Sequence, residues 1–89
     1  MKPPININNF VEEYRRDNDE FNREFDINEI SLGVIKSFIT PNLSDPELYS
    51  TYTIDEVTAD KINKCLSNKI SFDFDTYEYC FQRYGDYDE

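Results

Sequence analysis

Apolar residues recur along this chain with two different periods, and the changes of period predict where strands and helices lie. Between residues 9 and 27, two arms that fit extended chain flank the polar run Asp17-Asn18-Asp19-Glu20. Aspartate and asparagine tolerate the backbone angles of a turn, so this run predicts a β-hairpin. The same segment also fits one helix, in which four aromatic residues share a stripe: Phe10, Tyr14, Phe21 and Phe25. We favour the hairpin, because the polar residues of the run interrupt that stripe.

The next segment, residues 28–40, has the period of a helix. Its apolar positions recur every three or four residues, at Ile30, Val34, Ile35, Phe38 and Ile39. Asn28 or Ser31 is suited to cap its first turn. Thr40-Pro41 ends it, because the residue before proline is disfavoured in the helical region.

A loop at residues 41–52 follows, with a turn at Asp45-Pro46 and a short extended piece from Tyr49 to Ile54. Residues 53–67 then predict a further helix, which begins with the capping box Thr53-Ile54-Asp55-Glu56. Its expected inner face consists of Val57, Ile62, Cys65 and Leu66. Asp60 and Lys64 are spaced for an ion pair between successive turns.

Residues 70–85 carry the densest aromatic content, and their period changes partway along. From Ile70 to Asp75, apolar and polar residues alternate, which predicts a half-buried strand with Phe72 and Phe74 in the core. Asp75 is suited to cap a helix, and Gly85 to end it. Between them, one helical stripe is formed by Tyr77, Cys80, Phe81 and Tyr84.

Together these elements predict an α+β fold in a small single domain, residues 1–89, with an N-terminal β-hairpin packed against about three short helices. Residues 1–8 are expected to form a loose arm and residues 86–89 an acidic tail. A domain of this size buries a limited core, and its seven phenylalanines and seven tyrosines partly compensate for that.

The chain carries 19 acidic and 9 basic residues, a formal net charge of −10. Such a surface repels nucleic acid and anionic membranes and attracts basic proteins, although it also simply keeps a protein soluble. We expect no nucleic-acid or membrane partner and a monomer when free. The N-terminus lacks a long apolar run, which predicts a cytoplasmic protein with reduced thiols. Cys65 and Cys80 are expected to be buried structural thiols.

Histidine is absent, so the usual general base and zinc ligand are missing. The run at Asp17 resembles the start of a calcium loop, but Asn22 stands at its glycine position and Asn28 at its glutamate position. Two distant glycines form no phosphate-binding loop. We therefore expect no catalytic residues, no metal and no cofactor, and do not expect an enzyme.

Acidic residues next to tyrosines are the strongest candidates for binding a partner. Carboxylates bind arginine and lysine, and tyrosine supplies contact area at low entropic cost. The first candidate patch is Asp73, Asp75, Tyr79 and Tyr84, with the acidic tail. The second is Asp45, Glu47, Tyr49 and Tyr52.

Several short motifs resemble a small acidic bacterial family of unassigned function, over most of residues 10–84. They are Val11-Glu12-Glu13-Tyr14, Arg23-Glu24-Phe25-Asp26, Ile30-Ser31-Leu32, Asp45-Pro46-Glu47-Leu48-Tyr49, Tyr52-Thr53-Ile54, Phe72-Asp73-Phe74 and Tyr77-Glu78-Tyr79. At Cys80 the family usually has phenylalanine. Such proteins look like immunity proteins of polymorphic and contact-dependent growth-inhibition toxins. The resemblance supports the hairpin and brings no catalytic residues.

The resemblance and the charge together imply an immunity protein that binds and neutralises a basic, nuclease-type bacterial toxin. The alternative is a phage-type inhibitor that imitates nucleic acid, such as an anti-CRISPR or anti-restriction protein. That alternative predicts regularly spaced surface carboxylates rather than a compact patch. A small enzyme or metal-binding protein is a third possibility, against which the absence of histidine counts.

Overall fold

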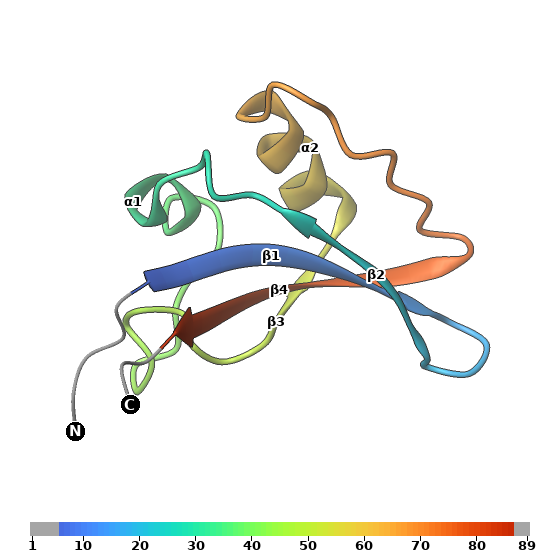
Figure 1. The fold of residues 1–89 in the computed structure, drawn as a ribbon, viewed down its shortest axis with the longest axis horizontal. Helices are drawn as coiled ribbons and strands as arrows, with labels where there is room; N and C mark the ends of the chain where they lie inside the picture. Colours follow the sequence, from blue (N-terminus) through green and yellow to red (C-terminus); the bar gives the residue numbers. More distant parts are fainter. Residues whose placement is uncertain (1–5, 87–89) are drawn as a thin grey trace.

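The computed structural model describes residues 6–86 of the chain, and its main element is an antiparallel sheet (Figure 1). The elements, in chain order, are β1 (Asn6–Arg15), β2 (Phe21–Asp26), α1 (Leu32–Ile35), β3 (Tyr52–Ile54), α2 (Glu56–Lys64) and β4 (Tyr77–Asp86). The four strands are arranged in the order β2-β1-β4-β3. The two central strands are therefore the first and the last of the described chain.

β1 and β2 form the hairpin that the sequence predicts, and the helical alternative for residues 9–27 is wrong. The polar run turns the chain, and the Arg15 N–H donates to the Glu20 carbonyl at 2.8 Å. Asp19 has a φ of 57°, a left-handed conformation that aspartate tolerates better than most residues. The register shifts at Glu13 and Tyr14, so that Tyr14 lies opposite Phe21.

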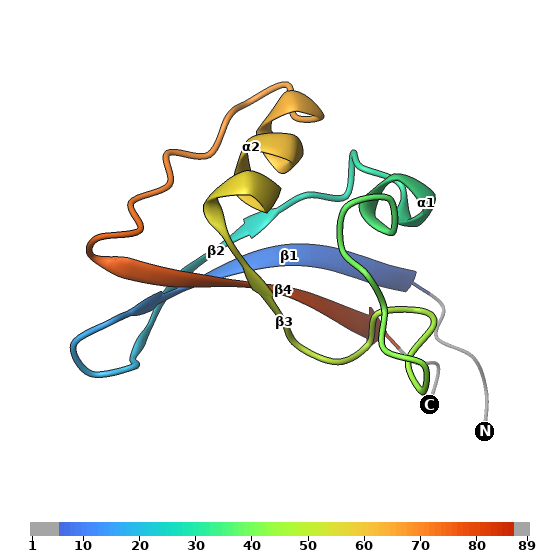
Figure 2. The same ribbon diagram turned by 180° about the vertical axis from the view of Figure 1, so that it is seen from behind.

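Both helices lie on the same side of the sheet, and the two opposite views in Figures 1 and 2 agree on this arrangement. Odd-numbered residues of the central strands point toward the helices, because side chains alternate across a strand. Val11 and Phe81 are cross-strand partners on that side and are fully buried. They form the core with residues that include Ile35 of α1 and Ile62 of α2.

The predicted fold class is wrong: the hairpin belongs to a four-stranded sheet with two helices, rather than packing against about three helices. The helix predicted after Asp75 is the strand β4, which pairs with β1 along its whole length and with β3. In β4 the core residue Phe81 stands between Cys80 and Tyr84, which lie on the other face of the sheet, and together the three imitate a helical stripe. Asp75 lies in the turn before β4 and caps no helix.

The two helices that exist are shorter than predicted. Only Leu32–Ile35 of residues 28–40 is helical, with Ser31 as its N-cap, and turns continue it to Ile39. α2 is capped by Asp55, whose carboxylate accepts a hydrogen bond from the Thr58 N–H at 2.7 Å, and not by the predicted Thr53.

The inner face of α2 was partly mispredicted. Ile62 and Leu66 are buried, whereas Val57 is 65% exposed and Cys65 is exposed. Val57 precedes Ile62 by five residues, which places it about 140° away around the helix, so the two side chains do not share the inner face. The predicted ion pair is confirmed, with 3.1 Å between Lys64 Nζ and Asp60 Oδ2.

The strand predicted from Ile70 to Asp75 is also wrong, because this segment is irregular until β4 begins. Its rings still pack against the core: Phe72 and Phe74 stack on each other at 5.7 Å, and both meet the Tyr79 ring edge-on. The extended piece predicted from Tyr49 is limited to β3. Residues 6–8 of the predicted arm belong to β1, and Asp86 of the predicted tail ends β4. The other residues of both lie outside the described range.

Candidate protein-binding surface

The side of the sheet opposite the helices is the open face, which no helix within residues 6–86 covers (Figure 2). Cross-strand pairing places the even-numbered residues of β1 and β4 on this face, together with their partners on β2. Its main side chains are Phe10, Glu12, Tyr14, Phe21, Glu24, Asp26, Glu78, Cys80, Gln82 and Tyr84. The open face therefore combines aromatic rings with carboxylates.

Glu12 lies at the centre of the open face and is only 5% exposed. Its carboxylate accepts hydrogen bonds from the Tyr84 hydroxyl at 2.6 Å and the Tyr14 hydroxyl at 3.0 Å. The Cys80 thiol donates a third, at 3.7 Å. A buried carboxylate costs free energy unless it is hydrogen-bonded, and these three donors meet that need. The network fixes both tyrosine rings on the surface.

All three donors around Glu12 hold their protons more firmly than usual. Burial, reinforced by the hydrogen bond to Glu12, raises the pKa of Tyr14 to about 12. The hydrogen bond to Glu12, followed by burial, raises the pKa of Tyr84. Burial, together with the charge of Glu12, raises the pKa of Cys80 to about 12. Cys80 therefore stays a thiol at neutral pH and is a weak nucleophile.

Two pairs of aromatic rings flank Glu12. Phe10 and Tyr84 lie 5.8 Å apart between ring centroids, and Tyr14 and Phe21 meet edge to face at 5.7 Å. Phe21 is 53% exposed and Tyr84 is 46% exposed. Exposed rings that are already held in place are suited to pack against a partner, since little side-chain entropy remains to be lost.

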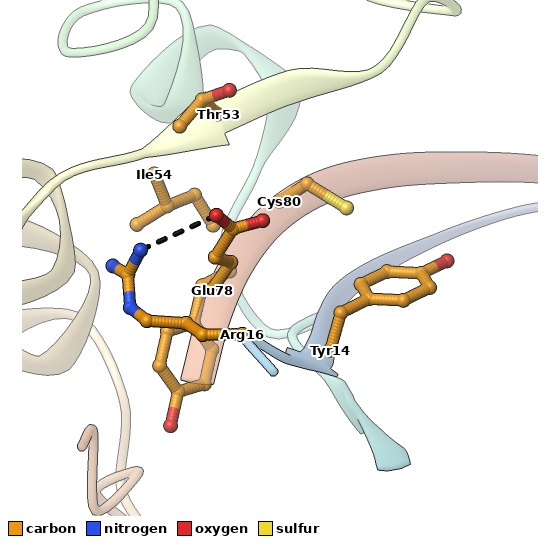
Figure 3. Close-up of a pocket in the computed structure, with 7 residues that line it drawn as sticks. Tyr14, Arg16, Thr53, Ile54, Glu78 and Cys80 are labelled. Atoms are coloured by element: carbon orange, nitrogen blue, oxygen red, sulfur yellow. Dashed lines mark hydrogen bonds and ion pairs between the residues drawn. The ribbon is translucent and has the colours of Figure 1, made fainter. Parts of the chain in front are cut away.

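A hollow of about 280 Å³ opens where the open face meets β3. Figure 3 shows the Arg16 guanidinium reaching toward the Glu78 carboxylate, and the distance between Arg16 Nη1 and Glu78 Oε1 is 3.2 Å. The lining residues are Tyr14, Arg16, Thr53, Ile54, Glu78, Tyr79 and Cys80. The hollow thus has a carboxylate, a hydroxyl and an aromatic ring in its walls.

Glu13 forms the matching network on the core side of the sheet and is completely buried. Its carboxylate accepts hydrogen bonds from Tyr79 Oη at 2.6 Å, Asn22 Nδ2 at 2.6 Å and Arg23 Nε at 3.0 Å. Burial, reinforced by the hydrogen bond that the Tyr79 hydroxyl donates to Glu13, raises the pKa of Tyr79 to about 12. The network joins β2, β1 and β4 and serves the fold.

The structure does not bring the first predicted patch together on one surface, although the Asp73 N–H donates to the Tyr79 hydroxyl at 3.0 Å. Tyr79 is 2% exposed on the core side, whereas Tyr84 lies on the open face. Asp73 and Asp75 are exposed on the irregular segment before β4. The prediction placed Tyr79 and Tyr84 on a helix. They belong to the strand β4, in which an odd-numbered and an even-numbered residue point to opposite sides of the sheet.

The second predicted patch is a true cluster in the loop before β3. Asp45 accepts hydrogen bonds from the backbone N–H groups of Tyr49 and Ser50 and from the Tyr52 hydroxyl. The Tyr52 hydrogen bond and these N–H groups lower the pKa of Asp45. Asp45 and Tyr52 therefore hold the loop. The exposed members are Glu47, which pairs with Lys36 at 3.7 Å, and Tyr49, whose ring lies 5.0 Å from the Arg83 guanidinium.

Most residues of the open face were not predicted as a site. The signal was present in β1, where Phe10, Glu12 and Tyr14 alternate with core residues. It pointed to one face of the hairpin, but it did not indicate that β4 supplies Tyr84 from 72 residues away.

The predicted burial of both thiols is also corrected, since Cys65 is exposed and Cys80 is half-buried. Among residues 6–86, no three carboxylates or thiols are grouped so as to hold a metal ion. In the same range, no helix has the length and apolarity needed to cross a membrane.

Comparison with known proteins gives one match. A family model described as a domain of unknown function (DUF7683) matches residues 8–82. No curated protein and no solved structure matches the chain. The matched segment begins in β1 and ends in β4, so it includes the hairpin, both helices and most of the open face. The chain belongs to the DUF7683 family of domains of unknown function.

Proposed function

We propose that this protein is a non-enzymatic inhibitor that binds a basic protein partner through the open face. By the resemblance described above, the partner is a nuclease-type bacterial toxin, and the protein is a cytoplasmic immunity protein. The observation that carries the proposal is the open face itself. It is an uncovered surface where exposed Phe21 and Tyr84 stand among carboxylates. Glu12 holds Tyr84 by a hydrogen bond, and Phe21 packs against the Tyr14 ring.

Charge supports a basic partner. The chain carries a net charge of −10, and Glu24 and Asp26 are exposed at the edge of the open face. A nuclease presents a basic cleft to the phosphates of its substrate. Opposite potentials speed the encounter of two proteins and orient them, and this effect weakens as salt is added.

The rings support tight docking after that encounter. Tyrosine and tryptophan dominate the strongest contacts of protein interfaces, and they act at the centre of a contact where water is excluded. Tyr84 and Tyr14 are both hydrogen-bonded to Glu12 and need not be ordered on binding. Most of their contact energy then contributes to affinity.

The test uses the protein that the tagged chain captures in a pull-down, purified and immobilised once its nuclease activity has been shown. Replacing Glu24 and Asp26 by lysine is expected to slow association at least tenfold, equivalent to about 1.4 kcal/mol in the barrier. The matched control carries Glu56→Lys and Asp60→Lys on α2, which makes the same change of net charge on the helical side. Equal effects of the two double variants would show that only total charge matters and would refute docking at the open face.

Asp73→Lys with Asp75→Lys gives a third arm of this test. Both residues are exposed next to the start of β4. If this variant slows association as much as Glu24→Lys with Asp26→Lys, the contact extends around the end of the sheet and includes part of the first predicted patch. If it behaves like the α2 control, the contact is confined to the open face.

The nucleic-acid-mimicking inhibitor is the weaker alternative. A mimic of a phosphate backbone needs exposed carboxylates at regular intervals, whereas Glu12 is buried and hydrogen-bonded to two tyrosines. Binding to a nucleic-acid enzyme in competition with DNA, with no loss on Tyr84→Ala, would favour this alternative over the immunity protein.

A further inference from the structure

We propose that the hollow beside β3 is a pocket for one arginine side chain of the partner, with Glu78 as its counter-ion. This inference rests on the proposed function and specifies what part of a basic partner enters the open face. In the free protein Arg16 pairs with Glu78, and we infer that the partner's arginine displaces it from this carboxylate.

The hollow is small enough to suit one side chain rather than a whole small-molecule ligand. Its volume of about 280 Å³ lies just below the range of about 300–1,000 Å³ that is usual for small-molecule sites. Buried Ile54 and Tyr79 also line it, so it is backed by the core of the sheet.

The walls supply what a guanidinium requires. Glu78 offers a carboxylate for charge-assisted hydrogen bonds, and the Thr53 hydroxyl can accept another. The Tyr14 ring offers a flat face on which a guanidinium can stack. Tyr14 is hydrogen-bonded to Glu12, so this wall is in place before any partner arrives.

A guanidinium already approaches Glu78, that of Arg16, but it is held weakly. The side chains of Arg16 and Glu78 are 44% and 53% exposed, and such exposed pairs contribute little stability. Arg16 has a second attachment, because its Nε donates to the Phe74 carbonyl at 2.6 Å. It can therefore release Glu78 without losing its place at the end of β1.

The test is a titration of the isotope-labelled full chain with the peptide acetyl-Gly-Arg-Gly-amide, followed by NMR. The matched probe replaces arginine by citrulline, which has nearly the same shape and no charge. The arginine peptide is expected to shift the backbone amide signals of Thr53 and Cys80 in a saturable way. The citrulline peptide is expected to leave them unchanged.

Two variants with opposite expected effects separate a binding role from a structural one. Glu78→Gln is expected to lower the affinity for the arginine peptide at least tenfold, because the counter-ion is lost. Arg16→Gln is expected to raise this affinity severalfold, because the peptide no longer has to displace the Arg16 side chain. The control, Asp60→Asn, breaks a comparable exposed pair on α2 and is expected to change nothing.

Equal binding of the citrulline peptide would overturn the proposal, as would unchanged binding to Glu78→Gln. Parallel weakening by Glu78→Gln and Arg16→Gln would also overturn it, because that result identifies the pair as a structural unit. The outcome is distinguishable from failure of the proposed function. If the peptide does not bind but Glu24→Lys with Asp26→Lys still slows the toxin, only the pocket is refuted.

Discussion

Glu12 and Glu13 are adjacent in the chain, and both are removed from water on opposite sides of the sheet. Each is hydrogen-bonded by a tyrosine of β4: Tyr84 reaches Glu12 on the open face, and Tyr79 reaches Glu13 on the core side. Burying a carboxylate is unfavourable unless hydrogen bonds replace those of water. These two pairs therefore make the contact between β1 and β4 specific, where apolar packing alone would tolerate a shifted register.

Tyr79→Phe leaves the ring in place and removes two hydrogen bonds, the one that the hydroxyl donates to Glu13 and the one that it accepts from the Asp73 N–H. We expect the free energy of unfolding to fall by about 1.5–3 kcal/mol, the range for hydrogen bonds to charged groups, as measured by urea denaturation. Tyr49→Phe is the matched control, because the Tyr49 ring is exposed and phenylalanine can retain its contact with Arg83. A loss no larger than that of the control would mean that Glu13 is satisfied without Tyr79.

The same variant reports on the pH dependence of stability. The pKa of Tyr79 rises from 10.0 in the free side chain to about 12 in the folded protein. The unfolded chain therefore loses this proton first, and the contribution of Tyr79 is complete below pH 10 and disappears as the pH rises through about 12. Urea denaturation between these values is expected to show a steeper loss of stability in the wild type than in Tyr79→Phe.

The elements were predicted well where the sequence signal was local. The hairpin was recognised because the run Asp17–Glu20 lies beside both of its strands. β4 was missed because β1 and β3, the strands that pair with its two edges, are distant in the chain. Cys80 and Tyr84 then read as part of a helical stripe with Phe81. The aromatic content of Tyr77–Tyr84, which favours strands, was the available signal against a helix.

The start of α2 shows the same limit on a smaller scale. Thr53 and Glu56 satisfied the pattern of a capping box, yet Thr53 belongs to β3 and pairs with Cys80. Asp55, inside the pattern, is the cap. The capping-box motif located the ends of this helix to within three residues. It could not show that Thr53, the first residue of the motif, pairs with β4 in the sheet instead.

We expect Asp55→Ala to lower the urea midpoint clearly, since it removes the hydrogen bond to the Thr58 N–H. Thr53→Ala should have a smaller effect, because the Thr53 side chain caps no helix. Far-ultraviolet circular dichroism during denaturation measures both. A larger loss for Thr53→Ala would place the N-cap at Thr53 and contradict the assignment.

The candidate site was the part least accessible to sequence patterns. Tyrosines next to carboxylates were correctly noticed as a feature of the chain, but the open face depends on which strands become neighbours. Glu12 and Tyr84 meet only because the first and last strands pair, and no local period records that pairing. The cluster around Asp45 was predicted because its members lie within eight residues of one another.

The whole molecule carries far more negative than positive charge, and its ion pairs are mostly exposed. Exposed pairs contribute little, whereas the mutual repulsion of a net charge of −10 opposes the compact state. Self-repulsion is therefore the larger electrostatic term for stability, and a basic partner would relieve it.

Raising the salt concentration from about 0.05 M to about 0.5 M shortens the screening length from more than 10 Å to about 4 Å and should weaken this repulsion. We expect the free energy of unfolding to rise over this range, measured by urea denaturation at constant pH. Sodium chloride and potassium chloride should act alike, because the effect is screening. A fall in stability would show that the ion pairs outweigh the repulsion.

The position of β4 beside β1 governs how the chain can fold as it is synthesised. A nascent chain on the ribosome can form the hairpin early, but the other neighbour of β1 is made only after some fifty intervening residues. Contacts so distant in sequence form slowly, because a long loop must be closed first. Until Tyr77 and the residues after it leave the exit tunnel, Val11 lacks Phe81, its partner on β4, and a chaperone would find it exposed.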